Sequence, residues 1–96
     1  MAGNADTEPP RYRRRADVRV AALDGEGVVL HLGSRRYFTV NETALVMLQE
    51  LASPRSAGEL ATLLTSRYDV TPQHAAASVE AFLERSVQAD MLAVEH

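Results

Sequence analysis

The sequence has 96 residues, 46% of them hydrophobic and 24% charged, with no cysteine and a net charge of −3. This length fits one domain, and the lack of cysteine excludes disulfides, thiolate metal sites and a cysteine nucleophile. No apolar run approaches the roughly 20 residues of a membrane-spanning helix, and no secretion signal is visible, so we expect a soluble cytoplasmic protein without membrane contact.

The charge is unevenly distributed along the chain. Residues 1–40 hold seven arginines and five acidic residues, a balance of +2, whereas residues 41–96 hold three arginines and eight acidic residues, a balance of −5. Binding to nucleic acid depends mainly on neutralising phosphates, so an acidic second half disfavours nucleic acid and favours a basic or neutral partner.

The N-terminal residues offer almost nothing to bury. Residues 1–15 mix small polar residues, a Pro-Pro pair and a basic cluster from Arg11 to Arg15. We therefore expect a flexible tail over residues 1–15 and a folded domain over residues 16–96. The basic cluster could hold nucleic acid or an acidic partner, or it could simply keep a disordered arm soluble.

Three short segments predict an antiparallel meander. Residues 17–22 and 28–32 alternate in the manner of strands, and the glycines between them permit a tight turn. Gly33-Ser34 predicts a second, two-residue turn. The third strand is expected over Arg35 to Val40, with Arg36, Phe38 and Val40 on one face and Arg35, Tyr37 and Thr39 on the other.

Local signals predict three helices after the strands. Asn41 can cap a helix, Ser56 and Glu59 have the spacing of a capping box, and Thr71 followed by Pro72 is typical of a helix start. The helices are expected to end near Pro54, Tyr68 and Ala89. The order predicts an α+β domain, a three-stranded antiparallel sheet followed by three helices.

No group of residues has the pattern of a catalytic or metal site. His31, His74 and His96 lack ligand spacing, and the sequence holds no glycine-rich phosphate loop or nucleophile motif. We therefore expect no enzyme activity, no catalytic residue, no cofactor and no metal.

The third helix offers a candidate binding surface. Glu80 and Glu84 stand one turn apart beside Val79, Leu83 and Val87, so they could border an apolar groove and meet basic residues of a ligand. The alternative is that both glutamates only keep the helix soluble.

The third strand and the helices carry a recognisable pattern. Its members are Arg36-Tyr37-Phe38-Thr39-Val40-Asn41-Glu42-Thr43-Ala44 with Leu48 and Leu51, then Ser56 to Tyr68 and Ala81-Phe82-Leu83. Over roughly residues 16 to 94 this pattern resembles the PqqD-like family, the recognition elements of ribosomally made, post-translationally modified peptides. The family commonly has a glycine before a Leu-Leu pair, where Asp90 precedes Met91-Leu92 in this chain.

The resemblance implies a winged-helix-like domain in which a leader peptide adds as an extra strand along the third strand. Leader side chains would then enter the cleft between that strand and the third helix. An unpaired strand edge suits this binding mode, because its free main-chain N–H and C=O groups are either protected from pairing or available to pair with a peptide. The peptide-binding residues implied are Arg35, Arg36, Tyr37, Phe38, Thr39, Val40, Val79, Glu80, Leu83, Glu84 and Val87.

Several of these residues also have purely structural interpretations. Arg35 and Arg36 are typical protection against edge-to-edge aggregation, and Phe38 and Val40 suit the floor of the core. A free-standing domain of this size looks most like the discrete recognition subunit of lasso-peptide biosynthesis, a monomer when free, which delivers the precursor to a separate leader peptidase. The alternatives are a PqqD-type partner of a radical enzyme, a winged-helix DNA-binding domain, and a scaffold domain without peptide specificity.

Overall fold

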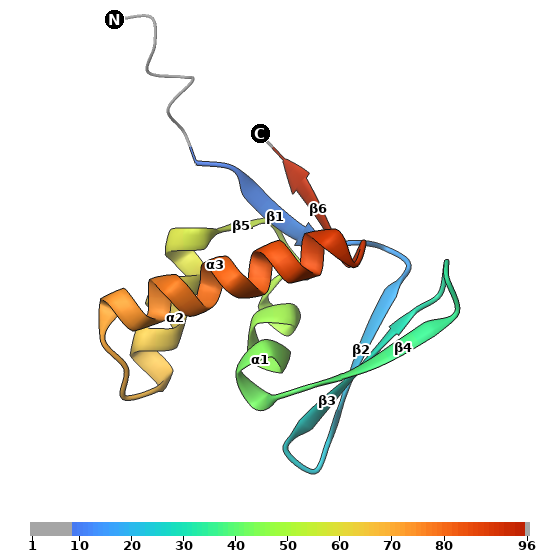
Figure 1. The fold of residues 1–96 in the computed structure, drawn as a ribbon, viewed down its shortest axis with the longest axis horizontal. Coiled ribbons are helices and arrows are strands. Elements are labelled where there is room, and N and C mark those ends of the chain that lie inside the picture. Colours follow the sequence, from blue (N-terminus) through green and yellow to red (C-terminus); the bar gives the residue numbers. More distant parts are fainter. Residues whose placement is uncertain (1–8, 96) are drawn as a thin grey trace, which may run out of the picture.

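The computed structural model describes residues 9–95, which form two three-stranded sheets and three helices (Figure 1). One sheet joins β2 (Val18–Leu23), β3 (Glu26–His31) and β4 (Arg36–Val40) in that order, all antiparallel. The helices are α1 (Glu42–Glu50), α2 (Ala57–Arg67) and α3 (Pro72–Gln88). The predicted α+β fold, with a three-stranded meander followed by three helices, is confirmed.

Two turns set the register of the meander. Asp24 and Gly25 connect β2 to β3 with φ angles of 50° and 82°, the left-handed pair that a tight hairpin needs. The second turn is longer than predicted, because residues 32–35 form it and β4 begins at Arg36. The N–H of Leu32 donates to the Asp17 carbonyl at 2.8 Å, which directs Leu32 toward β2 instead of β4. Arg35 therefore lies in the turn, with φ of 61°.

The predicted helix caps are all present. The side chain of Asn41 accepts a hydrogen bond from the Ala44 N–H at 2.9 Å, and that of Thr71 accepts one from the His74 N–H at 3.1 Å. In α2 the capping box is complete: the Ser56 hydroxyl accepts from the Glu59 N–H, and the Glu59 carboxylate accepts from the Ser56 N–H. Helix starts could be predicted because these bonds join residues only three apart.

The expected flexible tail is wrong for residues 11–14, whereas residues 1–8 lie outside the described part. Arg11 to Arg14 form β1, which pairs with β6 (Leu92–Glu95) and with the short β5 (Arg55–Ser56) in a second sheet. Figure 1 shows β1 and β6 side by side although they are the two ends of the described chain. Main-chain hydrogen bonds to β5 and β6 hold this strand, so its shortage of apolar residues does not indicate a flexible segment.

The end of α3 explains a departure from the family pattern. Asp90 stands where a glycine is common and adopts φ of 60°, the left-handed conformation that glycine favours. The next N–H, of Met91, donates to the Ser86 carbonyl at 2.9 Å and closes the helix. The chain then turns so that Met91 and Leu92 enter the core.

One core joins the sheet to the helices. Its members with the least exposure are Val29, Leu48, Leu51, Leu60, Ala75 and Val79, all at 0%. Burial of each large aliphatic side chain contributes about 1.5–3 kcal/mol. No helix within residues 9–95 has the length and apolarity needed to cross a membrane.

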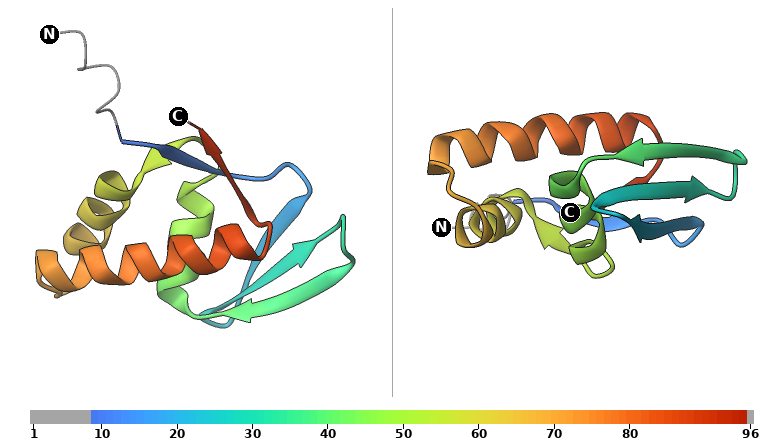
Figure 2. Two further views of the ribbon diagram at one scale, coloured as in Figure 1. Left: turned by 45° about the horizontal axis from the view of Figure 1, so that its top comes forward. Right: turned by 90° about the horizontal axis from the view of Figure 1, so that it is seen from below.

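The arrangement of α3 and the sheet positions the candidate site. Seen from below (Figure 2, right), α3 runs alongside β4, with β3 and then β2 farther away. The second edge of the sheet, formed by β2, faces the opposite side. The two edges of this sheet therefore have different surroundings.

Candidate functional site

The unpaired edge of β4 is the first feature of the site. Within residues 9–95, β4 pairs with β3 alone, over five positions from His31 with Arg36 to Gly27 with Val40. In an antiparallel pair each strand directs alternate N–H and C=O groups to its partner and the others outward. β4 therefore offers a row of main-chain donors and acceptors beside α3.

The side chains of β4 divide between the two faces as predicted. Phe38 and Val40 are half-buried and pack against the core. Arg36 shares their face, and its guanidinium lies 5.6 Å from the centre of the Phe38 ring, a cation–π contact. Tyr37 and Thr39 are exposed on the outer face, with Tyr37 72% accessible. The predicted division between core support and outward residues is confirmed.

Three adjoining hollows follow α3 from its C-terminal to its N-terminal end. The first, about 440 Å³, lies between β4 and α3 and is lined by His31, Ser34, Arg36, Phe38, Arg85, Gln88, Ala89 and Asp90. The second, about 280 Å³, is lined by Asn41, Thr43, Ala44, Met47, Ser78, Ala81, Phe82 and Arg85. The third, about 180 Å³, is lined by Thr43, Leu64, Tyr68, Val70, His74, Ala75 and Ser78. We call these three hollows together the β4–α3 groove.

Neighbouring hollows share lining residues, so the three hollows adjoin one another along α3. Arg85 lines the first and second hollows, and Thr43 and Ser78 line the second and third. The groove is therefore long enough to follow β4 and then pass the start of α1.

The predicted face of α3 does not line this groove. Val79 and Leu83 are buried in the core, at 0% and 5% exposure, and Val87 is half-buried against it. Glu80 and Glu84 are exposed but line none of the three hollows. The apolar stripe at helical spacing is the side that α3 buries, so Val79, Leu83 and Val87 support the core, whereas Glu80 and Glu84 are exposed.

Small side chains mark the face of α3 that does line the groove. Ser78 and Ala81 recur at a spacing of three and Arg85 and Ala89 extend the same face. Alanine and serine leave space that a larger side chain would fill. The recurrence of small residues beside the apolar stripe is the sequence signal for this face of α3.

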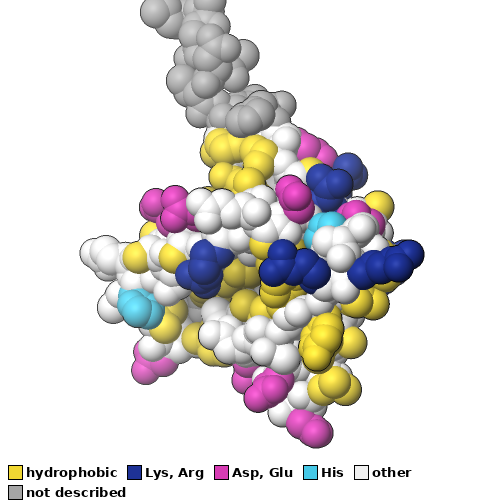
Figure 3. Space-filling view, turned by 45° about the vertical axis from the view of Figure 1, so that its right-hand side comes forward, with side chains coloured by type: hydrophobic (Ala, Val, Ile, Leu, Met, Phe, Trp, Pro, Cys, Tyr) yellow, Lys and Arg dark blue, Asp and Glu magenta, His cyan; other side chains and the backbone are white. Residues whose placement is uncertain are grey.

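The groove carries positive charge. Arg36 and Arg85 line the first hollow from opposite sides, one on β4 and one on α3, and Asp90 is the acidic residue there. Figure 3 shows basic side chains in a row across this side of the molecule, with hydrophobic surface beside them. A ligand that brings acidic and apolar side chains together would fit this surface.

The third hollow is lined by Tyr68, whose hydroxyl has a raised pKa. The Tyr68 hydroxyl donates to the Glu42 carboxylate at 3.4 Å. Burial raises the pKa of Tyr68, and the negative charge of Glu42 and this hydrogen bond raise it further. The hydroxyl thus stays protonated and links α2 to the start of α1. Within residues 9–95 no cluster of His, Cys, Asp or Glu could hold a metal ion.

The fold and the groove define an α+β domain with a sheet-then-helices layout and an accessible strand edge. The chain belongs to the PqqD family: the family profile described as "Coenzyme PQQ synthesis protein D (PqqD)" matches residues 26–92. A search of curated proteins found no significant match.

Two solved structures share the fold. "Lasso peptide synthetase B1 complexed with the leader peptide" is 29% identical, with a TM-score of 0.73, over 85% of this chain and 96% of that chain. "TbiB1 in Complex with the TbiA(beta) Leader Peptide" is 22% identical, with a TM-score of 0.71, over 83% of this chain and 93% of that chain.

Proposed function

We propose that the β4–α3 groove binds the leader segment of a ribosomally synthesised precursor peptide, which adds as a fourth strand to the free edge of β4. The observation that carries this proposal is the unpaired edge of β4 beside the adjoining hollows of the groove. Main-chain pairing supplies affinity with little dependence on sequence, and the hollows supply selectivity for particular side chains. The 29% identical structure, whose description names a leader peptide, supports the same ligand class.

The lining residues define the kind of leader that fits. Phe38 lines the first hollow with an apolar side chain, and Phe82 and Met47 do the same in the second. Arg36 and Arg85 favour a carboxylate in the first hollow. A micromolar complex requires about −8 kcal/mol. One added strand and two anchored side chains are sufficient for that affinity without covalent chemistry.

The domain would deliver the bound precursor to a separate modifying enzyme, for which we propose a leader peptidase of lasso-peptide biosynthesis. The 29% identical structure favours this assignment, since its description names a lasso peptide synthetase. A second candidate is a PqqD-type partner of a radical enzyme, which the description of the family profile favours. Neighbouring genes distinguish the two: a cyclase with a peptidase, or a radical enzyme.

Titration of the ¹⁵N-labelled protein with the co-encoded leader peptide tests the proposal. We expect saturable binding, with amide shifts concentrated in residues 36–40 and 78–89. A leader peptide of scrambled sequence is the control and should produce no saturable shifts. Saturable shifts confined to other parts of the chain, or none with the cognate leader, would contradict the proposal.

A further inference from the structure

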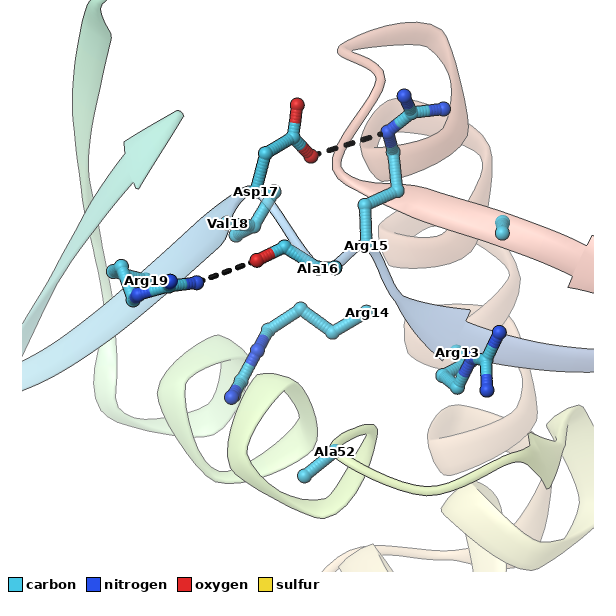
Figure 4. Close-up of a pocket in the computed structure, with 9 residues that line it drawn as sticks. Arg13, Arg14, Arg15, Ala16, Asp17, Val18, Arg19 and Ala52 are labelled. Carbon is cyan, nitrogen blue, oxygen red and sulfur yellow. Dashed lines mark hydrogen bonds and ion pairs between the residues drawn. The ribbon is translucent and has the colours of Figure 1, made fainter. Parts of the chain in front are cut away.

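A separate hollow lies away from the β4–α3 groove, beside β2 at the other edge of the sheet. It measures about 610 Å³, and four arginines line it, Arg13, Arg14, Arg15 and Arg19, together with Asp17. These residues belong to the end of β1, the turn that follows it and the start of β2 (Figure 4). The hollow shares no lining residue with the groove, and β3 separates β2 from β4.

Two of the four arginines already have acidic partners. Arg13 pairs with Glu95 at 3.3 Å, and Arg15 pairs with Asp17 at 3.4 Å. These pairs are substantially exposed and contribute little to stability. Their charges are neutralised within the chain, so they add little to the attraction for an external anion.

Arg14 and Arg19 differ, because neither has an acidic partner within residues 9–95. Each is fixed by one hydrogen bond to a main-chain carbonyl: Arg14 to Leu48 at 2.9 Å and Arg19 to Ala16. Figure 4 shows Arg14 extending toward the end of α1, whereas the Arg19 guanidinium is directed at the Ala16 carbonyl, and both side chains line the same hollow. Arg14 is also half-buried.

The bond from Arg14 to Leu48 has a structural use, since a cation at the end of α1 complements the helix dipole. That bond engages one of the five N–H donors of a guanidinium. A half-buried charge without a counter-ion is unfavourable, and an external carboxylate would relieve it. Two oriented guanidiniums with free donors are suited to bidentate recognition of carboxylates.

We propose that Arg14 and Arg19 form a docking site for an acidic segment of a partner protein. A nucleic acid is a poorer occupant because the basic area is compact, Asp17 and Glu95 border it, and the chain as a whole is acidic. The site goes beyond the proposed function, since it does not depend on what binds along β4. It leaves the domain able to hold a peptide in the groove and a partner beside β2.

A hexaglutamate peptide at low ionic strength is the probe, with hexaglutamine as the uncharged control. We expect hexaglutamate to shift the backbone signals of residues 13–19 and the side-chain signals of Arg14 and Arg19, and salt to weaken the binding. Arg14→Gln and Arg19→Gln should each weaken it about tenfold. Arg67→Gln, at an exposed arginine of α2 outside the hollow, should leave it unchanged.

Arg14→Gln removes a contact with α1, so circular dichroism must show that the variant is folded. If Arg14→Gln is not folded, Arg19→Gln decides the test, because the hydrogen bond of Arg19 joins residues only three positions apart. Absence of shifts in residues 13–19, or equal weakening by Arg67→Gln, would overturn the proposal. Tighter binding of inorganic phosphate or duplex DNA than of hexaglutamate at these arginines would overturn the assignment to a protein partner.

Discussion

The imidazole of His31 joins two segments 59 positions apart: its Nε2 lies 3.0 Å from the carbonyl oxygen of Asp90. The Ser34 N–H donates to Nδ1 at 3.1 Å, so the ring proton is on Nε2, which donates to Asp90. The ring is only 7% exposed. This contact connects the end of β3 to the turn after α3, and both residues line the first hollow of the β4–α3 groove.

Replacement of His31 by leucine should destabilise the fold by about 1–3 kcal/mol, because the Asp90 carbonyl and the Ser34 N–H both lose their partner. Urea unfolding of the two proteins measures the difference. His74→Leu is the matched control: the described hydrogen bonds include none from its side chain, so its free energy of unfolding should stay within about 0.5 kcal/mol of the parent. Equal stabilities for both variants would show that the contact contributes nothing.

The features that could be predicted from the sequence are local ones. Helix starts at Asn41, Ser56 and Thr71 depend on bonds between neighbours in the chain, and the alternation in β4 depends on a period of two. The family pattern added the expectation of an open edge at β4. Each of these rests on information contained within a few consecutive residues.

The features that escaped prediction depend on distant contacts. β1 forms because it pairs with β6 from the other end of the chain, and no short window of sequence records that pairing. The face of α3 that lines the three hollows is hard to predict for a related reason. Ser78 and Ala81 matter for the space they leave, whereas Val79 and Leu83 gave a stronger pattern that belongs to the core.

The face of α3 that lines the three hollows makes a prediction for Ala81. Its side chain is exposed and lines the second hollow, so Ala81→Trp should fill the groove and weaken leader binding at least tenfold, about 1.4 kcal/mol. Calorimetric titration with the leader peptide measures the change. Ala76→Trp, at an exposed alanine of the same helix outside all three hollows, is the control and should bind normally. Equal affinity for Ala81→Trp and the parent would place the leader elsewhere.

Strand addition at β4 predicts an alternating pattern of amide protection. In the free protein, hydrogen exchange should be slow at alternate residues of Arg36–Val40, those that donate to β3, and fast at the others. The leader should slow exchange at the fast set without altering the slow set. The amides of β2 serve as the internal control, because that edge lies away from the groove. Uniform protection of all five residues would indicate general stabilisation instead of strand pairing.

The capping box of α2 predicts that the stability of the fold decreases as the pH is lowered into the acidic range. The hydrogen bond from the Ser56 N–H lowers the pKa of Glu59, and Arg11, 3.3 Å away, lowers it further, although desolvation opposes both. A lowered pKa in the folded state means that the stabilisation is present above the ordinary pKa of a glutamate and is lost as the pH falls through the folded value. Glu59→Gln should therefore reduce the loss of stability on acidification.

Urea unfolding of the parent and of Glu59→Gln at neutral and acidic pH measures this effect. The difference in the free energy of unfolding between the two proteins should be largest near neutral pH. It should narrow as the pH falls, since a protonated Glu59 resembles glutamine in charge. Glu80→Gln is the control, because Glu80 is exposed on α3 and has no ion pair within residues 9–95. A gap for Glu59→Gln that does not change with pH would show that the carboxylate charge is not what stabilises the start of α2.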